Sequence, residues 1–559
     1  MADSKSAPPS EQMVPKLWSS FREGYGMGDF RADLIAGLTV AIVALPLSMA
    51  IAIASGVGPE VGLYTAIVGG FLVSAFSGSK HQIGGPAGAF IVLVAATVAR
   101  NGIDGLILAT ALSGLMMIAA GWLRLGSYIK FIPYPVTIGF TAGIAIIIFA
   151  SQLRDLFGLT IVGKEPGELI EKLKTLSQFA GTVNTSAVAV ALLTIVLIFG
   201  VRRFLPKWPN LLIAVGAAAL VAYVFNLGVE TIGTKFGGIP STIPAPRLPN
   251  MSTELIVAVL PDALSFALLG AIESLLSAVV ADGMTGRRHR SNMELVGQGI
   301  ANVGSALFGG FCVTGTIART ATNVRAGAKT PVSGMLHALF ILLFMMVAAP
   351  LASYIPLAAL AGVLATVAWN MIEKPAFAAL LRSSVGDALV LLATFLMVVF
   401  RDLTEGIIVG FALGAIIFID RMSRNIEISQ HLDEATEEDL FRADDPDIAA
   451  YRINGVFFFG AAATVGAALD RIADQRKNFI LDCSAVPFLD STAANVIEGS
   501  VRKASRQGVR FIISGASPDA RKMLETHHVA EPHVMFQPNM KAAFAAAKAA
   551  TAAAAAPAH

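Results

Sequence analysis

The chain has 559 residues, of which 55% are hydrophobic and 14% are charged, and its mean hydropathy is +0.69. Soluble domains carry about 25% charged residues, so the composition excludes an ordinary soluble protein for most of the chain. A net charge of +2 argues against the strongly basic surface that is typical of nucleic-acid binding. Two cysteines in separate regions and scattered histidines predict neither a disulfide framework nor a metal or cofactor site.

Residues 1–33 are predicted to be a cytoplasmic N-terminal segment. Long apolar runs then fill residues 34 to about 420, after which charged residues return abruptly. The first run is long and follows a polar stretch, so it is interpreted as a membrane helix rather than a cleaved signal peptide. About fourteen membrane segments are predicted, near residues 34–54, 60–77, 86–99, 104–122, 133–151, 186–201, 209–226, 260–281, 294–309, 314–325, 331–350, 355–370, 386–400 and 403–420.

Two of these runs, 86–99 and 314–325, are too short to cross a hydrocarbon core of about 30 Å, which needs about 20 residues. Each is the third segment of its half, which indicates an inverted seven-plus-seven repeat over 34–230 and 255–425. With fourteen spans, most lysines and arginines of the short loops fall on one side, and the positive-inside rule makes that side, with both termini, cytoplasmic.

The two short segments both begin with glycines. The first, "GGPAGAFIVLVAATVA" (84–99), would present backbone N–H groups of Ala87, Gly88, Ala89 and Phe90 where a helix begins. The N-terminus of a helix carries a partial positive charge and binds anions without a basic side chain. The alternative interpretation is that these glycines only allow helices to pack closely.

The second segment, "GGFCVTGTIARTATNVRAGAKT" (309–330), places Gly315 and Thr316 where another helix begins, with Arg319 one turn inside. If the two N-termini face each other, an anion between them meets two sets of N–H donors and the charge of Arg319. Arg319 has a structural alternative as the partner of Glu273 in a salt bridge.

Glu273 lies near the middle of the apolar stretch "LLGAIESLLSAVVAD" (268–282). An ionisable side chain at the bilayer centre costs about 2.5–3.5 kcal/mol on insertion scales and normally faces a cavity or a partner. We hypothesise that Glu273 couples proton uptake to anion binding. The alternative is a carboxyl group that is hydrogen-bonded in the core, for which Ser277, one turn later, is a candidate partner.

The stretches "ALPLSMAIAIASGVGPEVGLYTAIVGG" (44–70), "GGPAGAF" (84–90), "AIESLLSAVVAD" (271–282) and "GTIARTATNVRAGAKT" (315–330) resemble the sulfate permease (SulP) family, also called solute carrier family 26. The resemblance implies a core domain and a gate domain that move against each other, and a homodimer. It also implies an anion pocket between the third and tenth helices. Its residues here would be Leu47, Ile51, Ala87 to Phe90, Ser274, Ser277, Gly315, Thr316, Ile317 and Arg319.

The same resemblance matches Glu273 with a carboxylate that binds the coupling ion. Bicarbonate transporters of cyanobacteria have aspartate there and take sodium, whereas glutamate resembles the proton-coupled bacterial members. Ala87 and Ile317 are apolar where the bicarbonate branch carries hydroxyl groups, which weakens a bicarbonate assignment.

From about Ile448 the pattern alternates between apolar strands and helices, which indicates a small α/β domain over residues 440–545. It resembles the STAS domain. The loop "FLDSTAANV" (488–496) matches the phosphoacceptor and partner loop of that fold, but Asp490, Ser491 and Thr492 also suit a helix N-cap. Residues 546–559 form an alanine-rich tail of low complexity.

Together these observations predict a polytopic α-helical protein of the bacterial inner membrane that transports a small anion by alternating access, coupled to protons. Sulfate-type oxyanions are favoured. C4-dicarboxylate symport with protons and bicarbonate transport with sodium remain alternatives, as do an anion channel and a STAS-centred signalling protein. No nucleophile–base or metal constellation predicts an enzyme.

Overall fold

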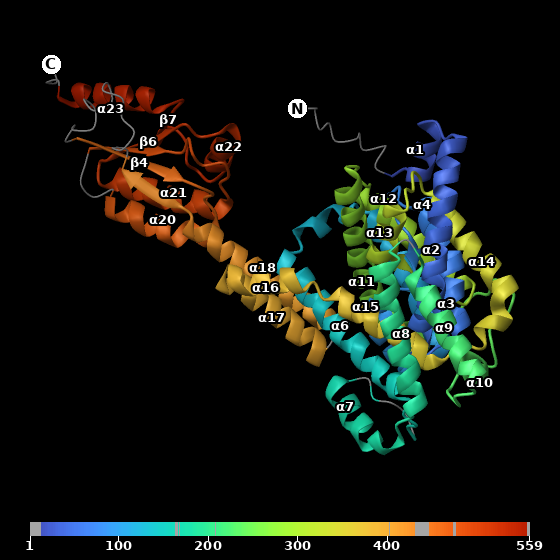
Figure 1. Cartoon of the computed structure of the whole chain (residues 1–559). Coiled ribbons are helices and arrows are strands. Elements are labelled where there is room, and N and C mark those ends of the chain that lie inside the picture. Colours follow the sequence, from blue (N-terminus) through green and yellow to red (C-terminus); the bar gives the residue numbers. More distant parts are fainter. Residues whose placement is uncertain are drawn as a thin grey trace. The chain divides into compact units, whose positions relative to one another are not determined.

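The computed structural model describes residues 13–162, 166, 168–206, 208–401, 403–430, 447–472 and 477–555. Residues 1–12 of the predicted N-terminal segment and residues 556–559 of the predicted tail lie outside the described residues. The chain divides into two compact units, Met1–Ala412 and Leu413–His559. Figure 1 shows the helices and strands of the chain, and each unit has its own hydrophobic core.

Nine helices in the described part of the chain are long and apolar enough to cross a membrane, which confirms the prediction of a polytopic helical membrane protein. Each of the fourteen predicted runs overlaps a helix, while the count of fourteen spans stays a prediction. The nine are Met27–Ala54 (α2), Pro59–Phe76 (α3, η1 and α4), Gly88–Trp122 (η2 and α5), Tyr134–Phe157 (α6), Thr185–Phe204 (α8), Thr253–Thr285 (α11), Val332–Ala352 (α14), Leu357–Ser383 (α15 and α16) and Leu403–Arg424 (α18).

Shorter helices complete the first unit. Several of them, including α7 and α16, have a polar face and no long apolar run, so hydropathy does not reveal them. The bounds are α1 (Lys16–Arg22), η3 (Leu125–Phe131), α7 (Leu169–Gln178), η4 (Ala180–Thr182), α9 (Asn210–Val224), α10 (Ile232–Phe236), α12 (Ser291–Leu307), α13 (Ile317–Arg325), α15 (Leu357–Met371), α16 (Lys374–Ser383) and α17 (Val385–Phe400).

The two predicted runs 86–99 and 104–122 meet in one element, α5 (Ile91–Trp122). Gly102 interrupts it with φ 68° and ψ −170°, a conformation that glycine adopts readily and that residues with a Cβ avoid. The predicted break between the runs is therefore a single residue at which the chain changes direction, not a loop.

The helices of the first unit form two groups by their contacts. A core group packs α2, α4, α5, α11, α12, α13 and α14 together, and a gate group packs α6, α8, α9, α15, α16 and α17 together. The groups meet where α2 contacts α9 and α15, and where α6 contacts η2 and α5. This arrangement agrees with the core and gate domains that the family resemblance implies.

Small residues allow a close helix crossing in the core group, between α5 and α12. A Cβ on Gly114 would lie 2.6 Å from the carbonyl oxygen of Gly299, and a Cβ on Gly299 would lie 2.4 Å from that of Gly114. Helix association in a membrane depends on such close backbone approach, because lipid supplies no hydrophobic force between helices. The crossing holds α12 against the helix that follows the first short segment.

The second unit contains a five-stranded sheet in the order β3-β4-β5-β6-β7. Only the β3–β4 pair is antiparallel. In β4, Ile448 and Ala450 pack with α23, while Ala449 and Ile453 belong to the larger core on the other face, as the two-residue period of a strand requires. The elements are β3 (Glu427–Gln430), β4 (Ile448–Asn454), α20 (Phe459–Ile472), β5 (Asn478–Asp482), α21 (Ser491–Arg506), β6 (Arg510–Ser514), α22 (Pro518–Thr526), β7 (Val534–Gln537) and α23 (Met540–Ala555).

Candidate functional site

Two short strands from opposite halves of the chain pair inside the core group. β1 (Gly84–Gly85) runs antiparallel to β2 (Thr314–Gly315), with Gly84 opposite Gly315. Beyond them, the N–H group of Thr316 donates to the carbonyl oxygen of Ile83 at 3.0 Å. β1 leads into η2 (Gly88–Phe90) and α5, and β2 leads into α13, so the pairing brings two helix N-termini to one place.

These N-termini present free backbone donors. The N–H groups of Gly88 and Ala89, and those of Ile317, Ala318 and Arg319, donate to no acceptor in the described part of the chain. Ala87 and Thr316 precede the helices in extended conformations. Unsatisfied N–H groups and the helix dipole make such ends positive, and together they suit an anion.

Arg319 supports this place with a full positive charge. Its side chain is 1% exposed, and Nη2 donates to Ser48 Oγ at 3.1 Å and to the carbonyl oxygen of Pro86 at 3.3 Å. Nε and Nη1 have no hydrogen-bond partner among the described residues. No carboxylate of those residues lies within 4.0 Å of it, and a buried charge without a counter-ion is costly.

The remaining predicted pocket residues differ in their burial and in their contacts. Leu47 and Ile51 are buried on α2 on either side of Ser48, and Ala87 is buried before η2. The ring of Phe90 is fully buried and packs edge-to-face with Phe266, with ring centroids 5.9 Å apart. In contrast, Ile317 is exposed at the start of α13.

Glu273 lies on α11, which contacts both β2 and α13. Asp262 and Asp282 lie 11 residues before it and 9 residues after it, distances of about 16 and 14 Å along a helix. Asp262 bonds Arg100, and Asp282 bonds His289. If these polar pairs lie at the two membrane boundaries, Glu273 is near the middle of a core about 30 Å thick.

The structure removes two alternatives for Glu273. Within the described residues, Glu273 and Arg319 form no ion pair, because the guanidinium group points to Ser48 and Pro86. The predicted hydrogen bond between Ser277 and Glu273 is wrong, because Ser277 Oγ donates to Thr320 Oγ1 at 3.1 Å. Ser277 therefore ties α11 to α13.

Ser274 belongs to a buried polar network that was not predicted from the sequence. Its Oγ donates to Glu294 Oε1 at 2.9 Å, and Gln82 Nε2 donates to the same oxygen at 3.0 Å. The N–H group of Gly78 donates to Glu294 Oε2 at 3.0 Å. The network joins α11, α12 and the segment before β1, so the hydroxyl group of Ser274 is used to support the strands.

A signal for this network is present in the sequence of α12. Glu294, Gln298 and Asn302 recur every four residues, which places them on one helix face. Asn302 bonds both backbone groups of Val313, at 2.9 and 3.0 Å. With its amide group turned to satisfy both atoms, Gln298 accepts from the N–H group of Gly315 at 3.0 Å. This polar stripe holds β2 in position.

In the second unit, Asp490 is the N-cap of α21. Its Oδ1 accepts from the N–H group of Ala493 at 2.9 Å, and its Oδ2 accepts from that of Phe459 at 3.0 Å. Ser491 and Thr492 are exposed at the start of the helix. Asp490 thus has a structural role that does not depend on a partner. The described residues contain no cluster of three or more histidine, cysteine or acidic side chains that suits a metal ion.

Comparison with known proteins places these features in context. Residues 30–394 match the sulfate permease family, and residues 443–542 match the STAS domain. The chain is 40% identical to "Putative sulfate transporter YvdB" of Bacillus subtilis, over 91% of this chain and 97% of that protein. It is 32% identical to "Bicarbonate transporter BicA" of Synechocystis, over 89% of this chain and 90% of that protein. The structure of murine solute carrier 26 family member A9 in the inward-facing state shares the fold, with a TM-score of 0.84 and a sequence identity of 18%. The match covers 98% of this chain and 96% of that chain.

Proposed function

This chain belongs to the sulfate permease family, and from that membership we propose that it is a secondary active transporter of a small anion. It is not an enzyme in this proposal. It moves the anion across the bacterial inner membrane by alternating access of the core group against the gate group. Both termini are cytoplasmic, and the chain works as a homodimer.

One observation carries the proposal, namely the convergence of two helix N-termini at the β1–β2 pair. The free N–H groups of Gly88, Ala89, Ile317 and Ala318 supply donors from both halves. The buried Arg319 adds charge without a carboxylate partner in the described residues. Since the strands belong to the core group, a rigid movement of that group would carry a bound anion with it.

A sulfate-type oxyanion is the favoured substrate. Backbone donors from two directions suit a tetrahedral anion, and the relative YvdB is named a putative sulfate transporter. A C4-dicarboxylate is the second candidate, because helix N-termini recognise negative charge and size. Bicarbonate is the third, since a second relative is named a bicarbonate transporter, although Ala87 and Ile317 bring no hydroxyl group to the site.

Glu273 is proposed as the proton-coupling residue. It lies on the helix that contacts β2 and α13, yet it makes no ion pair with Arg319 in the described part of the chain. Protonation of its carboxylate removes a negative charge close to the anion, which favours anion binding. A passive anion pore gains nothing from a carboxylate at this depth, which argues against an anion channel.

The test is uptake of labelled sulfate, fumarate and bicarbonate into proteoliposomes, each with and without an inward proton gradient, and with and without sodium. Glu273→Gln is compared with wild type and with Glu254→Gln, a matched change at the exposed start of α11. We expect gradient-driven uptake to be lost in Glu273→Gln, while counterflow exchange and the Glu254→Gln variant remain active.

Two results would contradict parts of the proposal. Uptake of one anion that ignores both the proton gradient and Glu273→Gln would exclude proton coupling through this residue. Failure of every anion to enter, together with a signalling defect from Ser491→Ala or Thr492→Ala, would favour the alternative of a STAS-centred signalling protein.

A further inference from the structure

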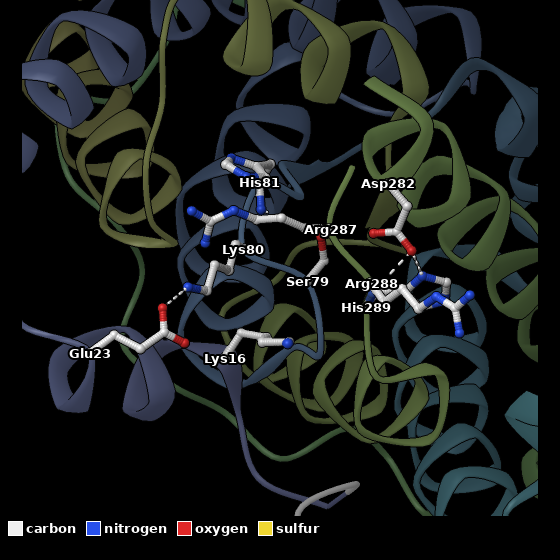
Figure 2. Close-up of a pocket in the computed structure, with 9 residues that line it drawn as sticks. All are labelled: Lys16, Glu23, Ser79, Lys80, His81, Asp282, Arg287, Arg288 and His289. Carbon is white, nitrogen blue, oxygen red and sulfur yellow. Dashed lines mark hydrogen bonds and ion pairs between the residues drawn. The ribbon is translucent and has the colours of Figure 1, made fainter. Parts of the chain in front are cut away.

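A basic cavity lies in the first unit, and none of the residues that line it belongs to the β1–β2 pair. Its volume is about 340 Å³, within the roughly 300–1,000 Å³ that small-molecule sites occupy. Three parts of the chain line it, namely α1, the segment that leads from α4 to β1, and the segment that ends α11 and follows it (Figure 2). None of the residues that line the cavity belongs to the proposed transport site.

The charges in this cavity do not balance. Lys16, Lys80, Arg287 and Arg288 contribute four positive charges, and Glu23 and Asp282 contribute two negative ones. Figure 2 shows that both carboxylates already have partners, since Glu23 bonds Lys80 and Asp282 bonds His289. The side chains of Lys16, Arg287 and Arg288 form no ion pair or hydrogen bond with any described residue.

The environment of Lys16 reflects this excess of positive charge. Burial lowers the pKa of Lys16, and repulsion from Arg290 and Lys80 lowers it further. The neighbouring cations also act on Glu23, because its hydrogen bond to Lys80 lowers the pKa of its carboxyl group. An anion in the cavity would relieve the repulsion between these cations.

A second observation points to a ligand. His81 lines the cavity and is only 6% exposed, and both of its ring nitrogens lack a hydrogen-bond partner among the described residues. Burial, followed by repulsion from Arg287 and Lys80, lowers the pKa of His81 to about 4. A neutral imidazole has one N–H donor and one acceptor, and leaving both unused in a buried position is unfavourable.

We propose that this cavity is a binding site for a phosphate group, distinct from the site for the transported anion. The excess of two positive charges matches the charge of about −1.5 to −2 that a phosphate monoester carries near neutral pH. Arginine guanidinium groups bind phosphate oxygens through two parallel N–H bonds, and lysine adds a point charge. His81 supplies an N–H donor from the buried wall.

A bound phosphate would join three separate segments. Lys16 lies on α1, Lys80 lies four residues before β1, and Arg287 and Arg288 follow α11, which carries Glu273. The backbone already links these segments at one edge of the cavity, because Lys16 N–H donates to Ser77 and Arg290 N–H donates to Gly78. Phosphate binding therefore stabilises the ends of two elements that hold the transport site.

The phosphate group has two possible sources, an anionic lipid headgroup and a soluble phosphate compound. One arm measures calorimetric binding of inorganic phosphate and pyrophosphate to the purified full chain at low salt. The other arm places the chain in nanodiscs of phosphatidic acid, whose headgroup is a phosphate monoester, or of phosphatidylcholine, and counts the lipids retained in native mass spectrometry. Each arm compares wild type with Arg287→Ala/Arg288→Ala, which changes only exposed side chains.

The charge-matched control is Arg31→Ala/Arg325→Ala, which removes two exposed arginines that do not line the cavity. We expect the Arg287→Ala/Arg288→Ala variant to weaken binding about tenfold or more, and the control to bind as wild type does. Binding in the calorimetric arm alone identifies a soluble phosphate compound, and selective retention of phosphatidic acid in the nanodisc arm alone identifies a lipid headgroup.

Three results would overturn the proposal. The first is the absence of binding in both arms. The second is equal binding by Arg287→Ala/Arg288→Ala and wild type. The third is binding that falls in Arg319→Gln but not in Arg287→Ala/Arg288→Ala, which would assign the phosphate probe to the transport site instead.

Discussion

The substitution Gly85→Ala tests whether transport depends on where the Arg319 side chain lies, because it displaces the guanidinium group without removing its charge. A Cβ on Gly85 would lie 2.0 Å from Arg319 Nη1 and 3.0 Å from Cζ. An ordinary contact begins at 3.4 Å, so the guanidinium group has to move by the difference, about 1.4 Å. Gly85 does not have a positive φ angle, so alanine adds steric pressure without backbone strain.

The expected loss follows from the contacts of Arg319. Nη2 donates to Ser48 at 3.1 Å and to Pro86 at 3.3 Å, and moving the guanidinium group by more than 1 Å disturbs the geometry of these hydrogen bonds. One hydrogen bond to a charged group contributes about 1.5–3 kcal/mol. If anion binding depends on this geometry, uptake at low substrate concentration falls about 10- to 100-fold.

The assay is initial uptake into proteoliposomes, normalised to the amount of inserted protein. The matched control is Gly270→Ala on α11, where an added Cβ would meet Met117 at an ordinary 3.5 Å. We expect Gly270→Ala to transport as wild type does. Uptake by Gly85→Ala within twofold of wild type, in equal amounts of folded protein, would refute the idea that β1 positions Arg319 for the anion.

Three further predictions concern parts of the chain outside the proposed transport site. Asp33→Asn should lower the thermal midpoint in detergent, at a cost of about 1–3 kcal/mol, because Asp33 is fully buried and accepts hydrogen bonds from Lys329 and Thr330; an unchanged midpoint would contradict this role. Asp490→Ala should cost about 1–2 kcal/mol by removing an N-cap, seen as faster hydrogen exchange in the first turn of α21, whereas Ser491→Ala should leave exchange unchanged. Burial raises the pKa of Cys483 to about 12, so the thiol stays protonated at pH 8 and should resist iodoacetamide until the domain unfolds; peptide mass spectrometry of native and denatured samples locates the label.

The main elements of the membrane unit could be predicted from the sequence because hydropathy is a local property. Each apolar run corresponds to a helix, and the short runs at 86–99 and 314–325 correspond to the beginning of α5 and to α13. Helices α7 and α16 were missed because short amphipathic segments show no long apolar run. The strands β3 and β7, of four residues each, were missed because so short a pattern has little periodicity.

In the candidate site, too, some features could be predicted from the sequence and others could not. Its glycines, Arg319 and Glu273 were recognisable because each breaks an apolar pattern at a notable place. The partners of Ser274 and Ser277 were not, because Glu294 and Thr320 come from other segments of the chain. A polar residue in an apolar helix signals that a partner exists, but it does not identify which of several buried groups that partner is.

The sequence alone determined a helical membrane unit of the sulfate permease family with a C-terminal α/β domain, since hydropathy and motifs are written along the chain. Only the tertiary structure decided that Arg319 bonds Ser48 and Pro86 instead of Glu273. It also brought Lys16, Lys80 and Arg287 around one cavity, although they lie far apart in the sequence. The physical reason is that the strengths of hydrogen bonds and charge interactions depend on distance and burial in the folded chain, which residue spacing does not specify.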